Sequence, residues 1–349
     1  MKPLLKDYYG NPSALHWAGE PVKELLHQAR AQVAKLISSS PSEVIFTSGG
    51  SEANNLALKG FYFKYRSKGN HIITSKIEHP AVLNPCKFLE SIGAKVTYVG
   101  VDRFGRVSPE EIEKAITEDT ILISVMHSNN ETGTLQLKEI GRIAKKYDIA
   151  LHTDASQSIG KVPINVRDLS VDLLTIAGHK LYAPKGIGAL YIREGTALEP
   201  LIHGAGHEHG LRAGTENTLL AVGLGKACEL AEVLVRDSKI KDLTNYFWYQ
   251  LKEAFGESIV LNGHLEERLP NTLNVSFVNK IGQDILSANP HLAASTGSAC
   301  HSGIVELSPV LKAMNVPQEI GMGAIRFSLG RETTKEEIDL VVNLLKEEI

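Results

Sequence analysis

The chain has 349 residues, a formal net charge of −3 and three cysteines, with 43% hydrophobic and 22% charged residues. This composition is typical of a globular protein of about two domains, and the weak net charge argues against nucleic acid as the main partner. No apolar run is long enough to span a bilayer, and the cysteines lack metal-ligand spacing. We therefore expect no metal site, no direct nucleic-acid partner, no membrane partner and a reducing, cytoplasmic compartment.

Helical and strand patterns alternate through the first two thirds of the chain. Apolar residues recur at helical spacing between Glu20 and Ser38, and short β-type runs follow the helical stretches. The expected helices are 20–38, 52–65, 80–91, 109–116 and 137–147, and the expected strands are 44–46, 71–73, 96–99, 121–126 and 150–153. This alternation predicts βαβ units and a mainly parallel sheet covered by helices, in which ligands bind at the carboxyl ends of the strands.

The last third has a different pattern. A long helical pattern runs from Asn217 to about Phe255, and polar residues 236–239 near its middle mark the expected domain boundary. Further strands are expected at 273–277 and 325–328, followed by a terminal helix from Thr334. We predict an α/β fold with a large domain, residues 1–236, and a smaller C-terminal α+β domain, residues 237–349.

Lys180 and Asp154 form the first candidate pair for chemistry. Lys180 closes the run Ile176–Lys180, which begins with β-type residues, and Asp154 ends an earlier expected strand. A desolvated lysine can react as a neutral amine to form a Schiff base, and an aspartate can pair with a protonated pyridine nitrogen. The pair suggests pyridoxal 5′-phosphate (PLP). Taken alone, a strand-end aspartate and a solvated lysine are the alternative.

Further polar residues follow other expected strands and support one shared site. The turn Ser48–Ser51 opens a helix, so its backbone N–H groups can bind an anion; an ordinary capped turn is the alternative. His79 can stack on a cofactor ring and transfer protons, or simply begin a helix. Asn130 and Gln157 can each reach a phenolic oxygen, and Asn130 can instead bind a carboxylate or stabilise a turn.

Two residues in the last third can act on a substrate. Cys300 lies in a small, polar, glycine-flanked segment, whereas Cys86 and Cys228 lie on amphipathic helices and are expected to be buried. A thiol near a basic group such as His301 can supply a thiolate nucleophile. Arg326 stands in a mostly apolar strand, so its guanidinium needs either a substrate carboxylate or an internal salt bridge.

Seven motifs, in family order, resemble those of a known family. They are Phe46–Gly49, Glu78-His79, Asn129–Gly133, His152–Ala155, Gly178–Lys180, Arg212–Thr215 and Gly297–Cys300. The chain is similar to the cysteine desulfurases of the NifS/IscS type and to their relatives the selenocysteine lyases. These are class V aminotransferase-like PLP enzymes of fold type I, and the similarity extends from Tyr9 to Arg331.

The resemblance implies how the cofactor is bound. The cofactor-binding residues would be Gly50, Ser51, His79, Asn130, Asp154, Gln157, His179, Lys180 and Thr215. Lys180 would form the Schiff base, Asp154 would hold the pyridinium, and Gln157 would reach the phenolic oxygen. Thr215 would contact the phosphate from the other subunit of a homodimer.

The resemblance also implies the reaction. Lys180 would move the substrate α-proton, His79 would transfer protons, and Cys300 would attack the sulfur of PLP-bound L-cysteine. Alanine would leave, and the persulfide would pass to a sulfur-acceptor protein such as an iron–sulfur scaffold. The substrate-binding residues would be Asn11, Asn130 and Arg326.

The sequence departs from the family pattern in three places, of which Ala183, where Tyr-Gly-Pro is usual, is expected to affect only the local backbone. The strand that usually precedes the match at Tyr9 is absent, and Ala177 replaces a serine that binds the phosphate in many relatives. Losing one hydrogen bond to a charged group costs roughly 1.5–3 kcal/mol, so weaker PLP binding is expected. We expect an L-cysteine desulfurase. Residues Ser298–Ser302 also resemble selenocysteine lyase, which acts on L-selenocysteine, and a non-catalytic PLP-fold scaffold is a further alternative.

Overall fold

The computed structural model describes residues 1–297 and 306–348, so Cys300 and His301 lie outside the described residues. The chain divides into two compact units. Unit 1 comprises Met1–Val99, Pro109–His127 and Leu137–Arg236, and unit 2 comprises Gly100–Ser108, Ser128–Gln136 and the chain from Asp237. Besides the crossing after Arg236, the chain therefore makes two earlier excursions into unit 2.

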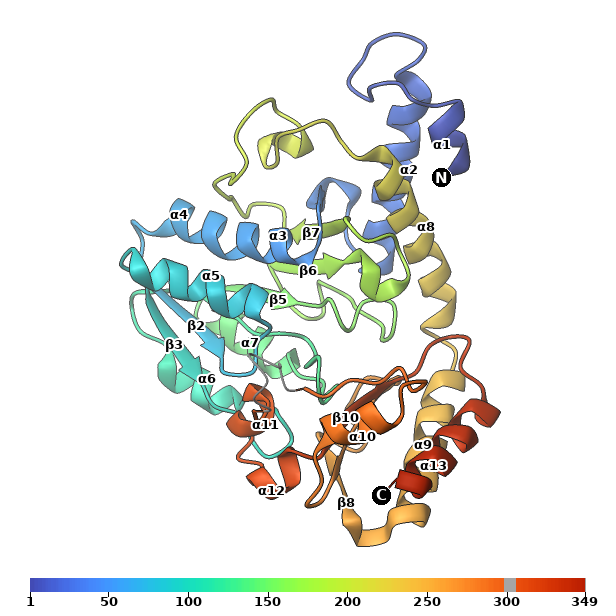
Figure 1. Cartoon of the computed structure of the whole chain (residues 1–349). Coiled ribbons are helices and arrows are strands. Elements are labelled where there is room, and N and C mark those ends of the chain that lie inside the picture. The colour runs from blue at the N-terminus through green and yellow to red at the C-terminus, as the bar shows by residue number, and fades with distance from the viewer. Residues whose placement is uncertain (298–305, 349) are drawn as a thin grey trace. The chain divides into compact units, whose positions relative to one another are not determined.

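Unit 1 contains a seven-stranded sheet of order β1-β7-β6-β5-β4-β2-β3 (Figure 1). Its strands are β1 (Val44–Thr47), β2 (His71–Ser75), β3 (Lys95–Val99), β4 (Thr120–Ser124), β5 (Ala150–Asp154), β6 (Leu173–Ala177) and β7 (Gly188–Ile192). Strands β2 to β6 pair in parallel, and β7 lies antiparallel between β1 and β6, so β1 runs in the direction of the parallel strands. The predicted α/β fold with a mainly parallel sheet is confirmed; β7 was not among the expected strands.

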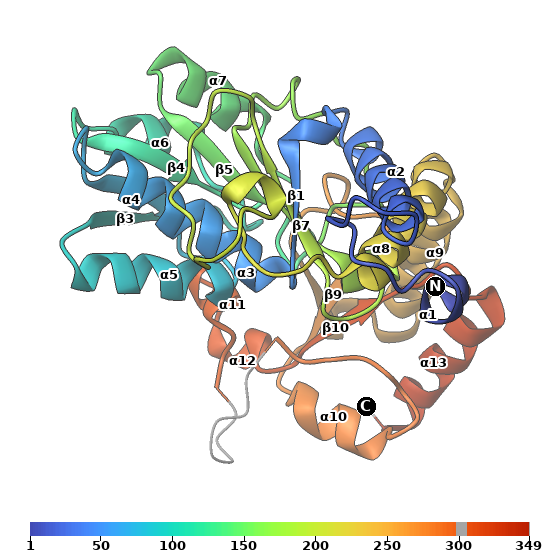
Figure 2. The same ribbon diagram turned by 90° about the horizontal axis from the view of Figure 1, so that it is seen from above.

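Helices cover both faces of this sheet. They are α1 (Lys2–Lys6), α2 (Glu20–Leu36), α3 (Gly50–Asn55), α4 (Phe61–Tyr65), α5 (Pro80–Ser91), α6 (Pro109–Ala115), α7 (Lys138–Lys146) and α8 (Thr218–Leu234). Figure 2 shows α3 and α5 on one side of the sheet and α6 and α7 on the other. All residues of β1, β2, β6 and β7 are buried, which explains why these strands do not alternate between apolar and polar residues.

Two expected helices have a different course from the one predicted. The stretch 52–65 contains a π-helical turn, Leu56–Gly60, between α3 and α4. The long pattern 217–255 is two helices, because α8 ends at Leu234 and the next helix begins at Lys239. Among the described residues, no helix is both long and apolar enough to cross a membrane.

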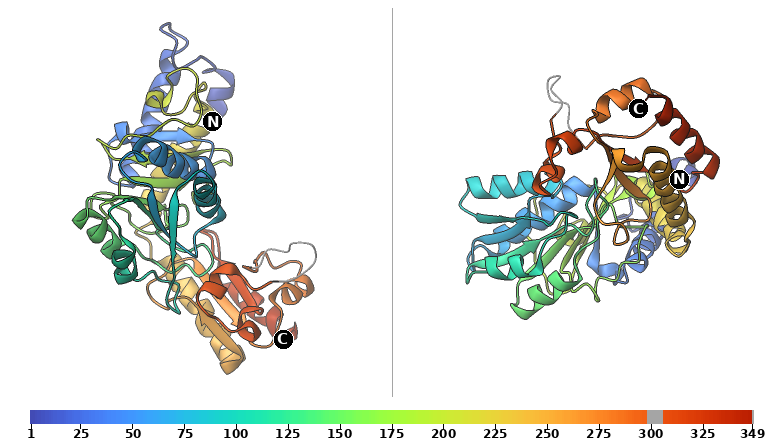
Figure 3. Two further views of the ribbon diagram at one scale, coloured as in Figure 1. Left: turned by 90° about the vertical axis from the view of Figure 1, so that its left-hand side faces the viewer. Right: turned by 90° about the horizontal axis from the view of Figure 1, so that it is seen from below.

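Unit 2 is built on a three-stranded antiparallel sheet of order β10-β9-β8 (Figure 3). Its strands are β8 (Ile259–Asn262), β9 (Thr272–Phe277) and β10 (Ala324–Ser328), and its helices are α9 (Lys239–Phe255), α10 (Gly282–Ala288), α11 (Pro309–Ala313), α12 (Gln318–Gly321) and α13 (Lys335–Glu348). Helices α9 and α13 pack against each other. Buried Phe247, Leu251, Val275, Phe277 and Leu345 belong to its core.

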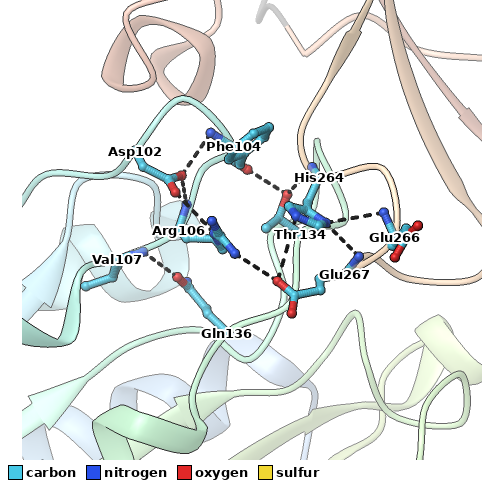
Figure 4. A network of polar contacts seen from close by, with 9 residues as sticks. All are labelled: Asp102, Phe104, Arg106, Val107, Thr134, Gln136, His264, Glu266 and Glu267. Atoms are coloured by element: carbon cyan, nitrogen blue, oxygen red, sulfur yellow. Dashed lines mark hydrogen bonds and ion pairs between the residues drawn. The ribbon is translucent and has the colours of Figure 1, made fainter.

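A polar network ties both excursions to the loop between β8 and β9 within unit 2 (Figure 4). Arg106 pairs with Glu267 at 2.8 Å. The hydroxyl of Thr134 donates to the carbonyl of Phe104 at 2.7 Å and accepts from the amide of His264 at 3.2 Å. These bonds explain why the excursions belong to unit 2, although they interrupt the sequence of unit 1.

Candidate active site

The sequence-predicted residues of unit 1 gather at one edge of its sheet. Because β1, β2, β5 and β6 run in the same direction, the segments that follow them leave the sheet at the same edge. Each of these strands is followed by, or ends at, one predicted site residue: Gly49 follows β1, His79 follows β2, Asp154 ends β5 and Lys180 follows β6. This is the edge at which open α/β sheets bind ligands.

Asp154 is the buried acidic group of this edge. Its side chain is fixed by two hydrogen bonds, because Oδ2 accepts from Nδ2 of Asn54 at 2.7 Å and Oδ1 accepts from the amide of Ser156 at 2.9 Å. Asn54 is 1% exposed, and its Oδ1 has no hydrogen-bond partner among the described residues. Asn54 was not predicted as a site residue; the sequence shows only two adjacent asparagines, Asn54 and Asn55, between Ala53 and Leu56.

Glu78 is a second buried carboxyl group beside Asp154. Its Oε1 accepts from the hydroxyl of Ser75 at 2.6 Å and from the amide of Met126 at 3.0 Å, while Oε2 has no partner among the described residues. Burial, reinforced by the charge of Asp154, raises the pKa of Glu78 to about 8. The carboxyl group is therefore mostly protonated at pH 7 and adds little negative charge to the site.

The glycine turn after β1 lies against the ends of two other strands. Gly49 has φ 151°, a conformation that glycine adopts readily. A Cβ on Gly50 would lie 3.1 Å from Cβ of Ala177 and 3.2 Å from Oγ of Ser156, so the turn packs closely on the ends of β6 and β5. A Cβ on Gly188 would lie 2.8 Å from Cα of Gly49. The backbone N–H groups at the start of α3 therefore lie next to Ala177. The side chain of Ser51 is exposed.

Lys180 and His179 lie in a 3₁₀ turn, Gly178–Leu181, directly after β6. Lys180 is half-buried and His179 is exposed. Partial burial and the neighbouring charges of Lys180, Lys185 and Lys161 lower the pKa of His179, so its imidazole is neutral at pH 7. The turn therefore carries a neutral histidine and Lys180, with the charges of Lys161 and Lys185 nearby, which suits an anionic ligand.

His79 and Gln157 follow β2 and β5. His79 is exposed and caps α5, since its Nδ1 accepts from the amide of Ala81 at 3.1 Å. Accepting at Nδ1 places the proton of the neutral ring on Nε2, which leaves that atom available as a donor. Gln157 is half-buried, three residues after Asp154, and its carbonyl accepts from Nζ of Lys161 at 2.6 Å.

Thr215 is exposed and lines a cavity of about 210 Å³ together with Ser48 and Arg212. Nε of Arg212 donates to Glu52 at 2.9 Å. Burial raises the pKa of Glu52, but hydrogen bonds from Arg212 and Ser48 outweigh it and hold the pKa below its usual value. The ionised Glu52 therefore connects the Arg212–Thr215 motif to the helix that begins at the glycine turn.

Among the described residues, no hydrogen bond of the Asn11 side chain connects it to the strand ends. It is exposed, and its Oδ1 accepts a hydrogen bond from the amide of Ser13 at 2.9 Å, within its own turn. Its predicted substrate-binding role therefore has no support from the geometry of this single chain.

Arg326 and Asn130 meet within unit 2. Arg326 is half-buried on β10, and its Nη1 donates to the backbone carbonyl of Asn130 at 2.8 Å. Nε of Arg326 is buried without a hydrogen-bond partner among the described residues, and within that part of the chain its guanidinium makes no ion pair within 4 Å. An internal salt bridge is therefore not what satisfies Arg326, and part of its guanidinium is available to a carboxylate.

Cys86 and Cys228 are fully buried, as predicted, and burial raises the pKa of each thiol to about 12. Neither can supply a thiolate near neutral pH. Among the described residues, no cluster of histidine, cysteine and carboxylate side chains could hold a metal ion.

Comparison with known proteins agrees with this arrangement. The family model for class-V aminotransferases matches residues 1–341. The chain is 50% identical to the cysteine desulfurase IscS of Dictyoglomus turgidum, covering 99% of this chain and 89% of that protein. The chain belongs to the NifS/IscS-type cysteine desulfurases of the class-V aminotransferase family.

Two solved structures have the same fold as this chain. A NifS-like protein superposes with a TM-score of 0.91 at 38% identity, over 99% of this chain and 93% of its own. SspA in complex with cysteine superposes with a TM-score of 0.82 at 40% identity, over 94% of this chain and 93% of its own. The predicted family and fold are thereby confirmed, and the protein is an enzyme of the cysteine desulfurase class; the comparisons favour neither a selenocysteine lyase nor a non-catalytic scaffold.

Proposed function

We propose that this cysteine desulfurase uses PLP to convert L-cysteine to L-alanine and retains the sulfur as a persulfide on Cys300. The observation that carries the proposal is the meeting of three features at one sheet edge. These are the fixed carboxylate of Asp154, the glycine turn at Gly49-Gly50 and the half-buried Lys180. Their chemistry matches a pyridine nitrogen, a phosphate and an aldehyde, in that order.

The residues present fit PLP. Asp154 is held at both oxygens by Asn54 and Ser156, so its charge has a fixed position for a pyridinium. Gly50 has no Cβ to crowd Ala177 and Ser156, and the amides at the start of α3 suit a phosphate. When bound, PLP withdraws electrons from the substrate Cα. Ala177 supplies no hydroxyl at the phosphate end, which supports the expected weaker binding.

The remaining steps depend on side chains of this chain. Lys180 would hold the cofactor through Nζ and then take the α-proton of the substrate. Nε2 of His79 would donate its proton, because Nδ1 accepts the hydrogen bond that caps α5. The available N–H of Arg326 would bind the substrate carboxylate, and the carbonyl of Asn130 would orient the guanidinium.

Cys300 would complete the reaction as a nucleophile. Its thiolate attacks the substrate sulfur, an S–S bond forms, and the Cβ–S bond of the substrate breaks. The carbon gains a hydrogen and leaves as alanine, while the two sulfurs are oxidised together to a persulfide, so no external oxidant is required. Transfer of that sulfur to an acceptor protein stays a prediction, as does a reducing, cytoplasm-like compartment.

A homodimer, with Thr215 at the partner's phosphate, is also part of the proposal. It is supported by an exposed apolar segment near the N-terminus, in which the side chains of Tyr9, Leu15 and Trp17 are 90%, 100% and 87% exposed. Such a group of large apolar side chains is costly to leave in water and is typical of an interaction surface.

The decisive experiment compares wild type with Cys300→Ala after loading with PLP. Both proteins should bind PLP, shown by the visible absorbance of the protein-bound cofactor, but only wild type should form alanine and a Cys300 persulfide, detected by mass spectrometry. A Lys180→Ala variant should lose the covalent link to the cofactor. Wild-type protein that binds no PLP, or Cys300→Ala protein that still forms alanine at the wild-type rate, would contradict the proposal.

A further inference from the structure

Asn54 is a buried asparagine that takes no step of its own in the proposed reaction. It lies in α3, four residues after Gly50, and is 1% exposed. Its neighbours Ala53, Ala57 and Leu58 belong to an apolar core and are fully buried. Burying an amide in such surroundings costs free energy unless its polar atoms are hydrogen-bonded, and Oδ1 of Asn54 has no partner among the described residues. An apolar side chain would therefore suit the packing at this position better than asparagine does.

Within the described part of the chain, the side chain of Asn54 makes one hydrogen bond, from Nδ2 to Oδ2 of Asp154 at 2.7 Å. This distance is at the short end of the range for N–H···O bonds, as expected for a charged acceptor. Because an ionised carboxylate only accepts hydrogen bonds, the contact fixes which end of the amide faces Asp154. The same orientation leaves Oδ1 of Asn54 without a donor, so the position serves the carboxylate better than it serves the amide.

Asp154 depends on neutral donors to stabilise its charge. It is 7% exposed and, in the part of the chain that the structure describes, forms no ion pair within 4 Å. Two titratable groups near it are neutral at pH 7, because burial lowers the pKa of His152 to about 4 and raises the pKa of Glu78 to about 8. Hydrogen bonds from Asn54 and from the amide of Ser156 are therefore what favours the ionised form of the carboxyl group.

Only one of these two donors belongs to a side chain. The amide of Ser156 is backbone two residues after Asp154, so almost any residue at position 156 would supply it. The amide of Asn54 comes from a helix that lies 100 residues earlier in the chain. We propose that Asn54 is a positioning residue that keeps Asp154 ionised and in a fixed orientation, so that the pyridine ring of PLP, and not the aspartate, holds the proton between them. This inference rests on the proposed use of PLP.

The shared proton has two possible positions. It can lie on the ring nitrogen, paired with an ionised Asp154, or on Asp154, which then donates it to a neutral ring. A hydrogen bond from Asn54 stabilises the ionised carboxylate and therefore favours the first position. A protonated ring withdraws electrons from the substrate more strongly than a neutral ring does, so Asn54 acts on the transfer of the α-proton through Asp154.

The test uses the full-length enzyme loaded with PLP that carries ¹⁵N in its ring, in wild type, Asn54→Leu and Asn54→Ala. The NMR chemical shift of the ring nitrogen distinguishes a protonated from a neutral pyridine. Wild type should give the protonated value, and both variants should move toward the neutral one. Both should also bind PLP about tenfold more weakly in equilibrium dialysis and lower kcat for alanine formation about 10- to 100-fold.

Asn55→Ala is the matched control. Asn55 is the next residue of the same helix, and its Nδ2 donates at 2.9 Å to the backbone carbonyl of Ser51, not to Asp154. The variant removes the same amide group from the adjacent position, so it should keep the wild-type chemical shift and kcat. A shift toward the neutral ring in this control as well would contradict the assignment to Asn54.

The two variants separate hydrogen bonding from packing. Leucine fills the position with an apolar side chain and alanine leaves it open, but neither donates a hydrogen bond. A protonated chemical shift retained in both would overturn the inference, even if their stability in urea without PLP had changed. A neutral ring nitrogen in wild type would overturn it without any variant. Wild-type protein that binds no PLP would instead overturn the proposed function, so the two failures are distinguishable.

Discussion

Replacing Glu78 by glutamine should make the protein less sensitive to rising pH. Glu78 is 4% exposed, and burial raises its pKa to about 8. The folded protein therefore binds a proton at Glu78 between pH 4.5 and 8 that the unfolded chain releases. The contribution of this group to stability is present below pH 4.5 and is lost as the pH rises through 8.

The size of the effect follows from the two pKa values. Each unit of difference corresponds to about 1.4 kcal/mol, so this group lowers the free energy of unfolding by about 2–3 kcal/mol between pH 5 and pH 7. Glutamine does not titrate and keeps an oxygen for the donors on Ser75 and Met126. The stability of Glu78→Gln relative to wild type should therefore increase by the same amount over this range.

Urea unfolding followed by circular dichroism, at pH 5, 6, 7 and 8 without PLP, measures this difference. Glu118→Gln, a change of the same type at an exposed position of unit 1, is the matched control and should track wild type at every pH. If the difference between Glu78→Gln and wild type stays constant from pH 5 to pH 8, the carboxyl group is already ionised in the folded protein and the reasoning is wrong.

Three other substitutions test separate parts of the structure. Ala177→Ser should lower the dissociation constant for PLP about tenfold or more, because a hydrogen bond to a charged group contributes about 1.5–3 kcal/mol. Equilibrium dialysis measures this constant. An unchanged dissociation constant would mean that residue 177 does not contact the phosphate. Phe277→Ala should lower the free energy of unfolding by about 3–5 kcal/mol, measured in urea, because Phe277 is 0% exposed in the core of unit 2. Glu208→Ala should lower the free energy of unfolding by about 3–5 kcal/mol in the same assay. The guanidinium of Arg30 is buried and lies 2.7 Å from Glu208 in the native protein, so the substitution removes its ion pair. Replacing both residues by apolar ones should recover most of the lost stability.

The alternation of helices and strands was enough to predict the parallel part of the sheet. It could not predict β7, because a five-residue apolar run gives no sign that it will lie antiparallel between β1 and β6. That pairing requires the close approach of Gly188 to Gly49, which is a contact between distant parts of the chain. Polar residues 236–239 indicated the break between α8 and α9. The helical spacing of apolar residues alone predicted one continuous helix across it.

The site residues that follow strands could be predicted from the sequence, because the alternation of helices and strands already predicted the parallel sheet. Asp154, Lys180 and the glycine turn occupy positions that any parallel sheet brings to one edge. Asn54 was not predicted, because no local pattern distinguishes a buried polar side chain in a helix from a solvated one. Its role depends on a partner 100 residues away along the chain.

The discontinuity of unit 2 bears on the order in which the protein can fold during synthesis. The chain crosses between the units after Val99, Ser108, His127, Gln136 and Arg236. Segments 100–108 and 128–136 leave the ribosome long before β8 and β9, so they must wait for their partners in the network of Figure 4. A fragment starting at Asp237 would lack Arg106 and Thr134, and should be recovered unfolded or aggregated unless those early segments are supplied with it.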